Sequence, residues 1–133
     1  MNFKLFFTAI VLMAFLGCQD AAPKKEVIVL MNSEAFQKEL ASNSEAQLLD
    51  VRTPEEVAQG QIPGAINMCV TCDGFEAALE TLNADEPVYV YCKVGGRSAK
   101  ASAIMKRLGF KKVYDLKGGY TAWKEANLPT ETP

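Results

Sequence analysis

Short hydrophobic runs alternate with amphipathic segments along most of the chain. The runs hold four or five residues rich in Val, Leu, Ile and Tyr, which is typical of buried strands. Between them, apolar residues recur at the spacing of helices that cover a sheet. The pattern predicts strands at 27–31, 48–51, within 62–67, at 88–91 and at 113–116, with a helix after each of them.

Local capping signals indicate where the predicted helices begin and end. Asn32 or Ser33 is suited to cap the first helix, and Pro54 suits the first turn of a short second helix. Asp73 is expected to cap a further helix, whose apolar face holds Phe75, Leu79 and Leu82. The helix at about 97–108 is expected to end at a glycine.

Strands that alternate with helices predict an α/β fold in which a central, mostly parallel sheet is flanked by helices on both faces. In such sheets the binding crevice lies beyond the carboxyl ends of the strands. Asp50, Asn67 and Cys92 each lie at or just after a predicted strand end. We therefore expect these three residues on one edge of the sheet.

Residues 1–17 have the proportions of a bacterial lipoprotein signal peptide. Lys4 precedes an uncharged apolar run at 5–16, which is shorter than the roughly 20 residues of a membrane-spanning helix. The sequence FLGC at 15–18 resembles the site at which such signals are cut, so Cys18 is expected to be acylated. An ordinary signal peptide is the alternative.

This interpretation divides the chain into three parts. Residues 1–17 would be removed, residues 18–26 would form a lipidated tether, and residues 27–130 would form the folded domain. We expect the domain at the bacterial cell envelope, facing the periplasm or the exterior and attached to the membrane through the N-terminal lipid only. Such compartments permit disulfides.

Charge and composition exclude several classes of protein. The 133 residues carry a formal net charge of -2 and contain no basic patch interleaved with aromatics, so nucleic acid is not expected as a partner. The sequence contains no histidine, which excludes Ser-His-Asp triads, Cys-His dyads and HExxH zinc sites. We expect neither a metal nor a cofactor.

The segment after the predicted strand 88–91 concentrates the reactive chemistry of the chain. Cys92 begins it, and a helix follows its last residues. Without histidine, a thiolate at Cys92 must be stabilised by loop amides, the helix N-terminus and nearby cations. We therefore predict a nucleophilic Cys92 above an anion-binding loop formed by Lys93, Val94, Gly95, Gly96, Arg97 and Ser98.

Four segments, in order along the chain, resemble the rhodanese-like sulfurtransferase family over nearly all of the sequence after residue 26. They are LLDVR at 48–52, GQIPGAIN at 60–67, VYCKVGGRS at 90–98 and LKGGYTAW at 116–123. The resemblance implies a parallel sheet flanked by helices, with Cys92 as the nucleophile that accepts sulfur. Val57 and Gln61 replace an aromatic residue and a histidine that are common in the family, and we expect both to affect packing only.

The resemblance implies a two-stage transfer, in which Cys92 takes a sulfane sulfur from a small anion such as thiosulfate and passes it to a thiol or to cyanide. Lys93 is the expected donor contact, because a basic residue there resembles the thiosulfate-using branch. Arg97 either assists or pairs with a carboxylate at the rim. A cysteine phosphatase is the less favoured alternative, because the loop between Cys92 and Arg97 is one residue shorter than the pattern of such phosphatases.

Two residues of the first predicted loop are expected to support the site. Asp50 is expected to tie down the active loop, and Arg52 to pair with Glu55 or Glu56. For both residues, this structural role is favoured over a direct part in catalysis.

The resemblance does not explain Cys69 and Cys72, which should lie on the same edge of the sheet as Cys92. A local disulfide or two reduced thiols is the favoured interpretation. The alternatives are a redox pair that resolves a Cys92 persulfide, and zinc held by all three cysteines. A thiol redox or docking module that uses this pair is the alternative function.

Overall fold

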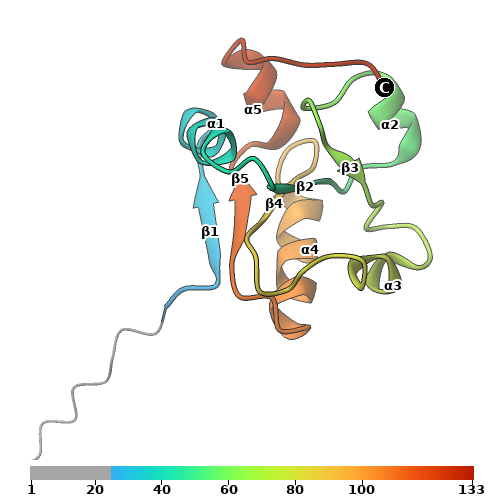
Figure 1. Cartoon of the computed structure of the whole chain (residues 1–133). Helices are drawn as coiled ribbons and strands as arrows, with labels where there is room; N and C mark the ends of the chain where they lie inside the picture. The colour runs from blue at the N-terminus through green and yellow to red at the C-terminus, as the bar shows by residue number, and fades with distance from the viewer. Residues whose placement is uncertain (1–24) are drawn as a thin grey trace, which may run out of the picture.

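The computed structural model describes residues 25–133, which form one sheet with helices on both faces (Figure 1). The predicted signal peptide and Cys18 lie outside the described residues. The described elements, in chain order, are β1 (Ile28–Met31), α1 (Ser33–Ala41), β2 (Gln47–Asp50), α2 (Pro54–Ala58), β3 (Ile66–Asn67), α3 (Phe75–Leu79), β4 (Val88–Tyr91), α4 (Gly96–Arg107), β5 (Val113–Leu116) and α5 (Gly119–Glu125).

The five strands follow the order β1-β5-β4-β2-β3, and every neighbouring pair is parallel. The predicted α/β architecture is therefore confirmed, with a fully parallel sheet among the described strands. The carboxyl ends of β2, β3 and β4 lie on one edge, because Asp50 pairs in register with both Asn67 and Tyr91. Cys92 directly follows Tyr91, so the three predicted edge residues do lie on the same edge.

Alternating side chains of the central strands supply two hydrophobic cores, one on each face of the sheet. In β4, Val88 and Val90 face the core that α3 and α4 cover, whereas Tyr89 and Tyr91 face the core that α1 and α5 cover. All four are buried, which explains why this strand is a continuous apolar run. The rigid sheet thereby fixes the position of the loop that begins at Cys92.

Most of the expected helix signals are confirmed. Oδ1 of Asn32 accepts a hydrogen bond of 2.9 Å from the N–H of Ala35, and Pro54 occupies the first turn of α2. Thr53 and Glu56 also form a reciprocal capping box at α2.

The predicted start of α3 is wrong. Asp73 does not cap this helix, because Gly74, with φ at +83°, occupies the capping position and makes no side-chain hydrogen bond. The helix also ends at Leu79, so Leu82 packs against the core from the turn that follows it. The helix α4 spans Gly96–Arg107, one residue earlier at each end than the prediction.

The two expected family departures contribute to packing. Val57 is buried on α2, and Gln61 forms an isolated antiparallel bridge with Glu131, whose Oε1 accepts a 2.8 Å hydrogen bond from Nε2 of Gln61. In residues 25–133, no helix has both the length and the apolar character needed to cross a bilayer.

Candidate active site

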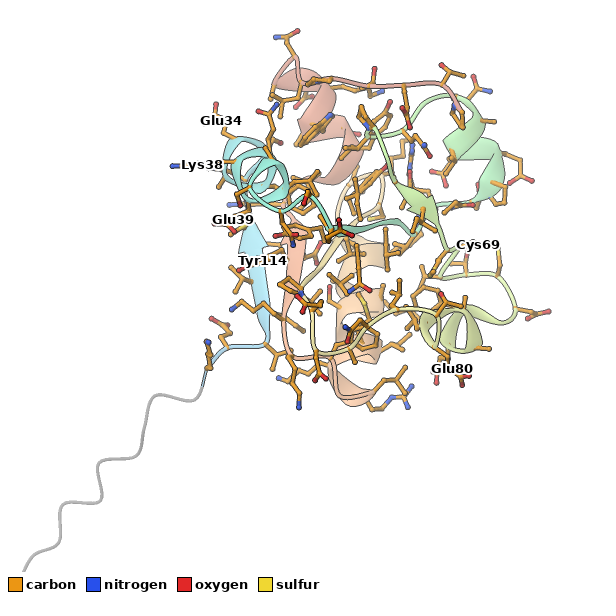
Figure 2. All side chains as sticks on the ribbon, viewed as in Figure 1. Glu34, Lys38, Glu39, Cys69, Glu80 and Tyr114 are labelled. Atoms are coloured by element: carbon orange, nitrogen blue, oxygen red, sulfur yellow. A yellow bond between two sulfur atoms is a disulfide. The ribbon has the colours of Figure 1, made fainter. Side chains whose placement is uncertain are left out.

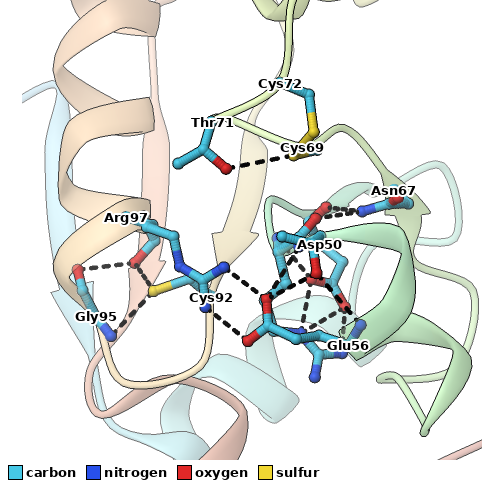
Figure 3. Close-up of polar contacts among 12 residues, drawn as sticks. Asp50, Glu56, Asn67, Cys69, Thr71, Cys72, Cys92, Gly95 and Arg97 are labelled. Carbon is cyan, nitrogen blue, oxygen red and sulfur yellow. Dashed lines mark hydrogen bonds and ion pairs between the residues drawn. A yellow bond between two sulfur atoms is a disulfide. The ribbon is translucent and has the colours of Figure 1, made fainter.

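Cys92 lies at the base of the loop that joins β4 to α4, and its residue surface is only 1% exposed. The backbone N–H of Gly95 donates a 3.0 Å hydrogen bond to Sγ of Cys92, and Oγ of Ser98 lies 3.5 Å from the same sulfur (Figure 3). Gly95 has φ at +118°, a conformation that glycine adopts without the strain of a side chain. This turn aims the Gly95 amide at the sulfur.

Burial raises the pKa of the Cys92 thiol, but hydrogen bonds from the loop outweigh burial and hold the pKa below its ordinary value. The lowering contributions come from the Ser98 hydroxyl and from the backbone N–H groups of Ser98, Gly95 and Val94. These groups lie at the N-terminus of the 12-residue helix α4, where the partial positive charge also favours an anion. The site therefore stabilises a thiolate without an imidazole.

Arg97 directs its guanidinium to Glu56 on α2, with Nη1–Oε2 and Nη2–Oε1 distances of 2.6 and 2.8 Å. This paired geometry is the second of the two alternatives that the sequence left open for Arg97. The hydrogen bonds from Arg97 lower the pKa of Glu56 from 4.5 to about 2, against a smaller opposing effect of burial. The ion pair joins α2 to the first turn of α4, beside Cys92 (Figure 3).

The expected partner of Arg52 is wrong. Arg52 pairs with Asp50, with an Nη2–Oδ2 distance of 2.6 Å, and Glu56 is taken by Arg97. Nη2 of Arg52 also donates to the carbonyl oxygen of Gly60 at 2.7 Å, and its guanidinium stacks over the ring of Tyr120 at 4.3 Å from the centroid. Both charges are almost fully buried, so each depends on the other.

Asp50 fixes the β2–α2 turn, rather than the active loop as the sequence suggested. Its Oδ1 accepts a 3.1 Å hydrogen bond from the backbone N–H of Arg52. Nδ2 of Asn67 ties the same turn to β3 by donating to the carbonyl oxygens of Asp50 and Arg52, at 2.9 and 2.8 Å. These bonds hold α2 where Glu56 can reach Arg97.

The start of α5 supports the active loop from the other side. The backbone N–H of Tyr120 donates to the carbonyl oxygen of Cys92 at 2.8 Å, and that of Thr121 donates to the carbonyl oxygen of Lys93 at 3.1 Å. A Cβ on Gly119 would lie 2.5 Å from the carbonyl oxygen of Cys92, so only glycine permits this approach. Sequence reasoning placed Gly118 and Gly119 in a family segment and missed this contact, which a GG pair at a helix start could have indicated.

Cys69 and Cys72 form a disulfide, as the favoured interpretation expected. Figure 2 shows Cys69 on the opposite side of the molecule from the helix α1. Both cysteines lie between β3 and α3, where Cys69 is half-buried and Cys72 is exposed. With both sulfurs in a disulfide, neither is a thiolate ligand for zinc. No metal-binding cluster of His, Cys, Asp or Glu occurs in residues 25–133.

The disulfide follows β3 on the same edge of the sheet as Cys92, and the hydrogen-bond partners of the Cys92 sulfur are Gly95 and Ser98 rather than either disulfide cysteine. The N–H of Val70 donates to the carbonyl oxygen of Val51, whose own N–H donates to the carbonyl oxygen of Tyr91. One extended segment therefore lies between the backbone of Val70, inside the disulfide loop, and that of Tyr91, which precedes Cys92, and two strand spacings correspond to roughly 10 Å.

A cavity of about 230 Å³ opens beside the active loop, between α2 and α5. Lys93 and Lys124 line it, and neither forms an ion pair with the described residues. The two acidic groups nearby, Asp50 and Glu56, are each paired with an arginine. The cavity therefore favours an anionic ligand.

Sequence comparison agrees with this geometry. A family model, the rhodanese-like domain, matches residues 32–126. A sulfurtransferase from Allochromatium vinosum is 34% identical over 103 residues, which cover 77% of this chain and 94% of that protein. The chloroplastic thiosulfate sulfurtransferase 16 of Arabidopsis thaliana is 40% identical over 93 residues, which cover 62% of this chain and 78% of that protein.

Solved structures show the same fold. The Alr3790 protein from Anabaena sp. matches with a TM-score of 0.70 at 27% identity, over 77% of this chain and 82% of that one. A rhodanese-related protein from Thermoplasma volcanium matches with a TM-score of 0.68 at 27% identity, over 77% of this chain and 97% of that one. Together, the sequence and structure matches show that the chain belongs to the rhodanese-like domain family.

Proposed function

We propose that this protein is a sulfurtransferase that moves a sulfane sulfur through a persulfide on Cys92. The observation that supports this most directly is the hydrogen bond from the Gly95 amide to Sγ of Cys92, at the N-terminus of a helix. Backbone amides aimed at a buried sulfur stabilise a negative charge on that sulfur. The same amides are placed to stabilise the outer sulfur of a persulfide.

With thiosulfate as donor, the Cys92 thiolate attacks the outer sulfur. A new S–S bond forms, the S–S bond of thiosulfate breaks, and sulfite leaves with the electron pair. An acceptor then attacks the outer sulfur of the persulfide: cyanide becomes thiocyanate, a thiol becomes a persulfide, and Cys92 leaves as a thiolate. Because the first product leaves before the acceptor reacts, ping-pong kinetics are expected.

Lys93 is the proposed contact for the anionic donor. It follows Cys92 directly and lines the cavity with Lys124, whereas Arg97 is held by Glu56. Thiosulfate carries two negative charges, which suits a cavity with two unpaired cations. The relative in Arabidopsis thaliana is named for the same donor.

A cysteine phosphatase is less well supported, both because the loop after Cys92 is short and because of the position of Arg97. Phosphatase chemistry needs an arginine fork for the phosphate oxygens. Arg97 offers its fork to Glu56 instead, with both N–O distances under 3 Å. A thiol redox or docking module remains the alternative for the Cys69–Cys72 pair, which the proposed reaction does not use.

We also propose that the domain is anchored at the bacterial cell envelope through acylated Cys18, facing the periplasm or the exterior. The support is the sequence of residues 1–18 and the disulfide, which oxidising compartments permit. Expression of the full chain with a labelled fatty acid tests this. Label that persists in Cys18→Ser would contradict the proposal.

Steady-state kinetics with thiosulfate and cyanide test the activity. Parallel double-reciprocal plots, and loss of thiocyanate formation in Cys92→Ser, are expected. The phosphatase alternative is tested on the same preparations with a chromogenic phosphate ester. Turnover of the ester in the absence of any sulfur transfer would reject the proposed function.

A further inference from the structure

Asp115 is a buried carboxyl group beneath the active loop that the proposed reaction does not use. It lies in the central part of the sheet, in register with Leu30 of β1 and Val90 of β4, and is 2% exposed. Oγ of Ser102 donates to its Oδ2 at 3.4 Å, whereas its Oδ1 has no hydrogen-bond partner. Within residues 25–133, Asp115 forms no ion pair.

This environment favours the protonated form of Asp115. An ionised carboxylate with one unpaired buried oxygen loses most of its solvation, whereas a neutral acid loses much less. Burial accordingly raises the pKa of Asp115, although the hydroxyls of Ser98 and Ser102 oppose the increase. The protonation state of Asp115 therefore decides whether these serine hydroxyls donate to its carboxyl group or accept a hydrogen bond from it.

Ser98, the neighbour of the nucleophile, lies on the same helix as Ser102, the hydrogen-bond partner of Asp115. Ser98 and Ser102 lie one helical turn apart on α4, and both are fully buried. Oγ of Ser98 lies 3.5 Å from Sγ of Cys92 and donates to the carbonyl oxygen of Gly95 at 3.1 Å. A serine hydroxyl has one proton, so it cannot donate to this carbonyl, to a carboxylate and to a thiolate at the same time.

We propose that Asp115 is a positioning residue that keeps its proton while Cys92 loses its own, so that the Ser98 hydroxyl turns to the thiolate. The proposal rests on the proposed function of Cys92. Neutral Asp115 donates its O–H to Oγ of Ser98, and Ser98 donates to the Cys92 sulfur. Each donor strengthens the next one in such a chain. An ionised Asp115 would instead attract the Ser98 proton and repel the thiolate.

The surroundings of Asp115 contain few competing charges. Ser102 of α4 donates to it, the Ser98 hydroxyl opposes the rise of its pKa, and its register neighbours in the sheet are Leu30 and Val90; none of these four residues titrates. Arg97, the charged residue next to Ser98, is paired with Glu56. Cys92 is the titratable group that this chain of contacts reaches.

The test is the pH dependence of Cys92 alkylation by iodoacetamide, a neutral reagent, in the folded wild type and in variants at Asp115. Asp115→Ala removes the donor to Ser98, and we expect about threefold to tenfold less thiolate at pH 7. Asp115→Asn supplies an amide donor of the same shape and should restore the wild-type profile. If Asp115 were ionised, both variants would increase the thiolate fraction, and the proposal would be wrong.

Two further measurements separate positioning from a general structural effect. Ser98→Ala should lower the thiolate fraction at least tenfold, and Ser102→Ala, one turn away, should lower it less. The infrared spectrum at pH 7 should contain a carboxylic-acid band that Asp115→Asn lacks; the absence of this band would overturn the proposal. Neither readout needs sulfur transfer, so a protein inert to thiosulfate would contradict the proposed function while this test stays decisive.

Discussion

The ion pair between Glu56 and Arg97 gives the most quantitative prediction, tested by Glu56→Gln. A pKa that falls from 4.5 to about 2 on folding corresponds to at most about 3 kcal/mol of stability, at about 1.4 kcal/mol per tenfold change in proton affinity. The side chains of Glu56 and Arg97 are 29% and 28% exposed, so solvent screens part of this. We expect Glu56→Gln to lower the free energy of unfolding at pH 7 by about 1–2 kcal/mol.

The sign of the pH dependence follows from the direction of the shift. Because folding lowers the pKa of Glu56, its contribution is fully present above pH 4.5 and is lost as pH falls toward 2. Urea denaturation of wild type and Glu56→Gln at pH 7 and pH 3 should therefore give a smaller difference at pH 3. Glu55→Gln, in the same turn of α2, is the matched control and should change stability little. An equal difference at both pH values would show that the ionised Glu56 carboxylate does not supply this stability.

Three further predictions concern the site and its surroundings. Lys93→Gln should raise KM for thiosulfate about fivefold, as expected for the loss of about 1 kcal/mol of charge attraction, and an unchanged KM would exclude Lys93 as the donor contact. Cys72→Ser, which opens the disulfide, should leave the rate of thiocyanate formation unchanged, because the proposed transfer uses Cys92 alone. A large loss would place the disulfide in the reaction. Gly119→Ala should lower the free energy of unfolding by about 2 kcal/mol and reduce the rate of sulfur transfer, because the new Cβ would lie 2.5 Å from the carbonyl oxygen of Cys92. Wild-type stability in urea denaturation would contradict this close approach.

The sheet could be predicted from the sequence because both of its faces are buried. The runs at 88–91 and 113–116 are apolar without interruption or nearly so, and the structure places strands there with the predicted bounds. The shared edge of Asp50, Asn67 and Cys92 followed from parallel strands alone. The topology of a parallel sheet was therefore enough to predict that the candidate nucleophile lies near Asp50 and Asn67.

Pairing of charges could not be predicted in the same way. Arg52 has three carboxylates within four positions along the chain, and the sequence does not say which one the β2–α2 turn presents to it. The turn folds Asp50 back onto Arg52, which leaves Glu56 for Arg97, 41 positions away. Such partners depend on side-chain direction at a helix start, which hydrophobic periodicity does not encode.

Two other features could not be predicted because they depend on backbone angles or on packing in the folded chain. Gly74, with φ at +83°, occupies the capping position of α3 in place of Asp73, and a backbone angle is not visible in the sequence. Asp115 occupies an otherwise apolar strand, where its neighbours on α4 become known only from the packing. Its proposed role could therefore arise only from the structure.

The central claim is that the loop after β4 stabilises a negatively charged sulfur on Cys92. The most direct test is mass spectrometry of the folded protein after incubation with thiosulfate, followed by peptide mapping without reduction. We expect one added sulfur atom on Cys92, an intact Cys69–Cys72 disulfide, and no addition in Cys92→Ser. A protein that gains no sulfur, or that carries the added sulfur on Cys69 or Cys72, would contradict the central claim.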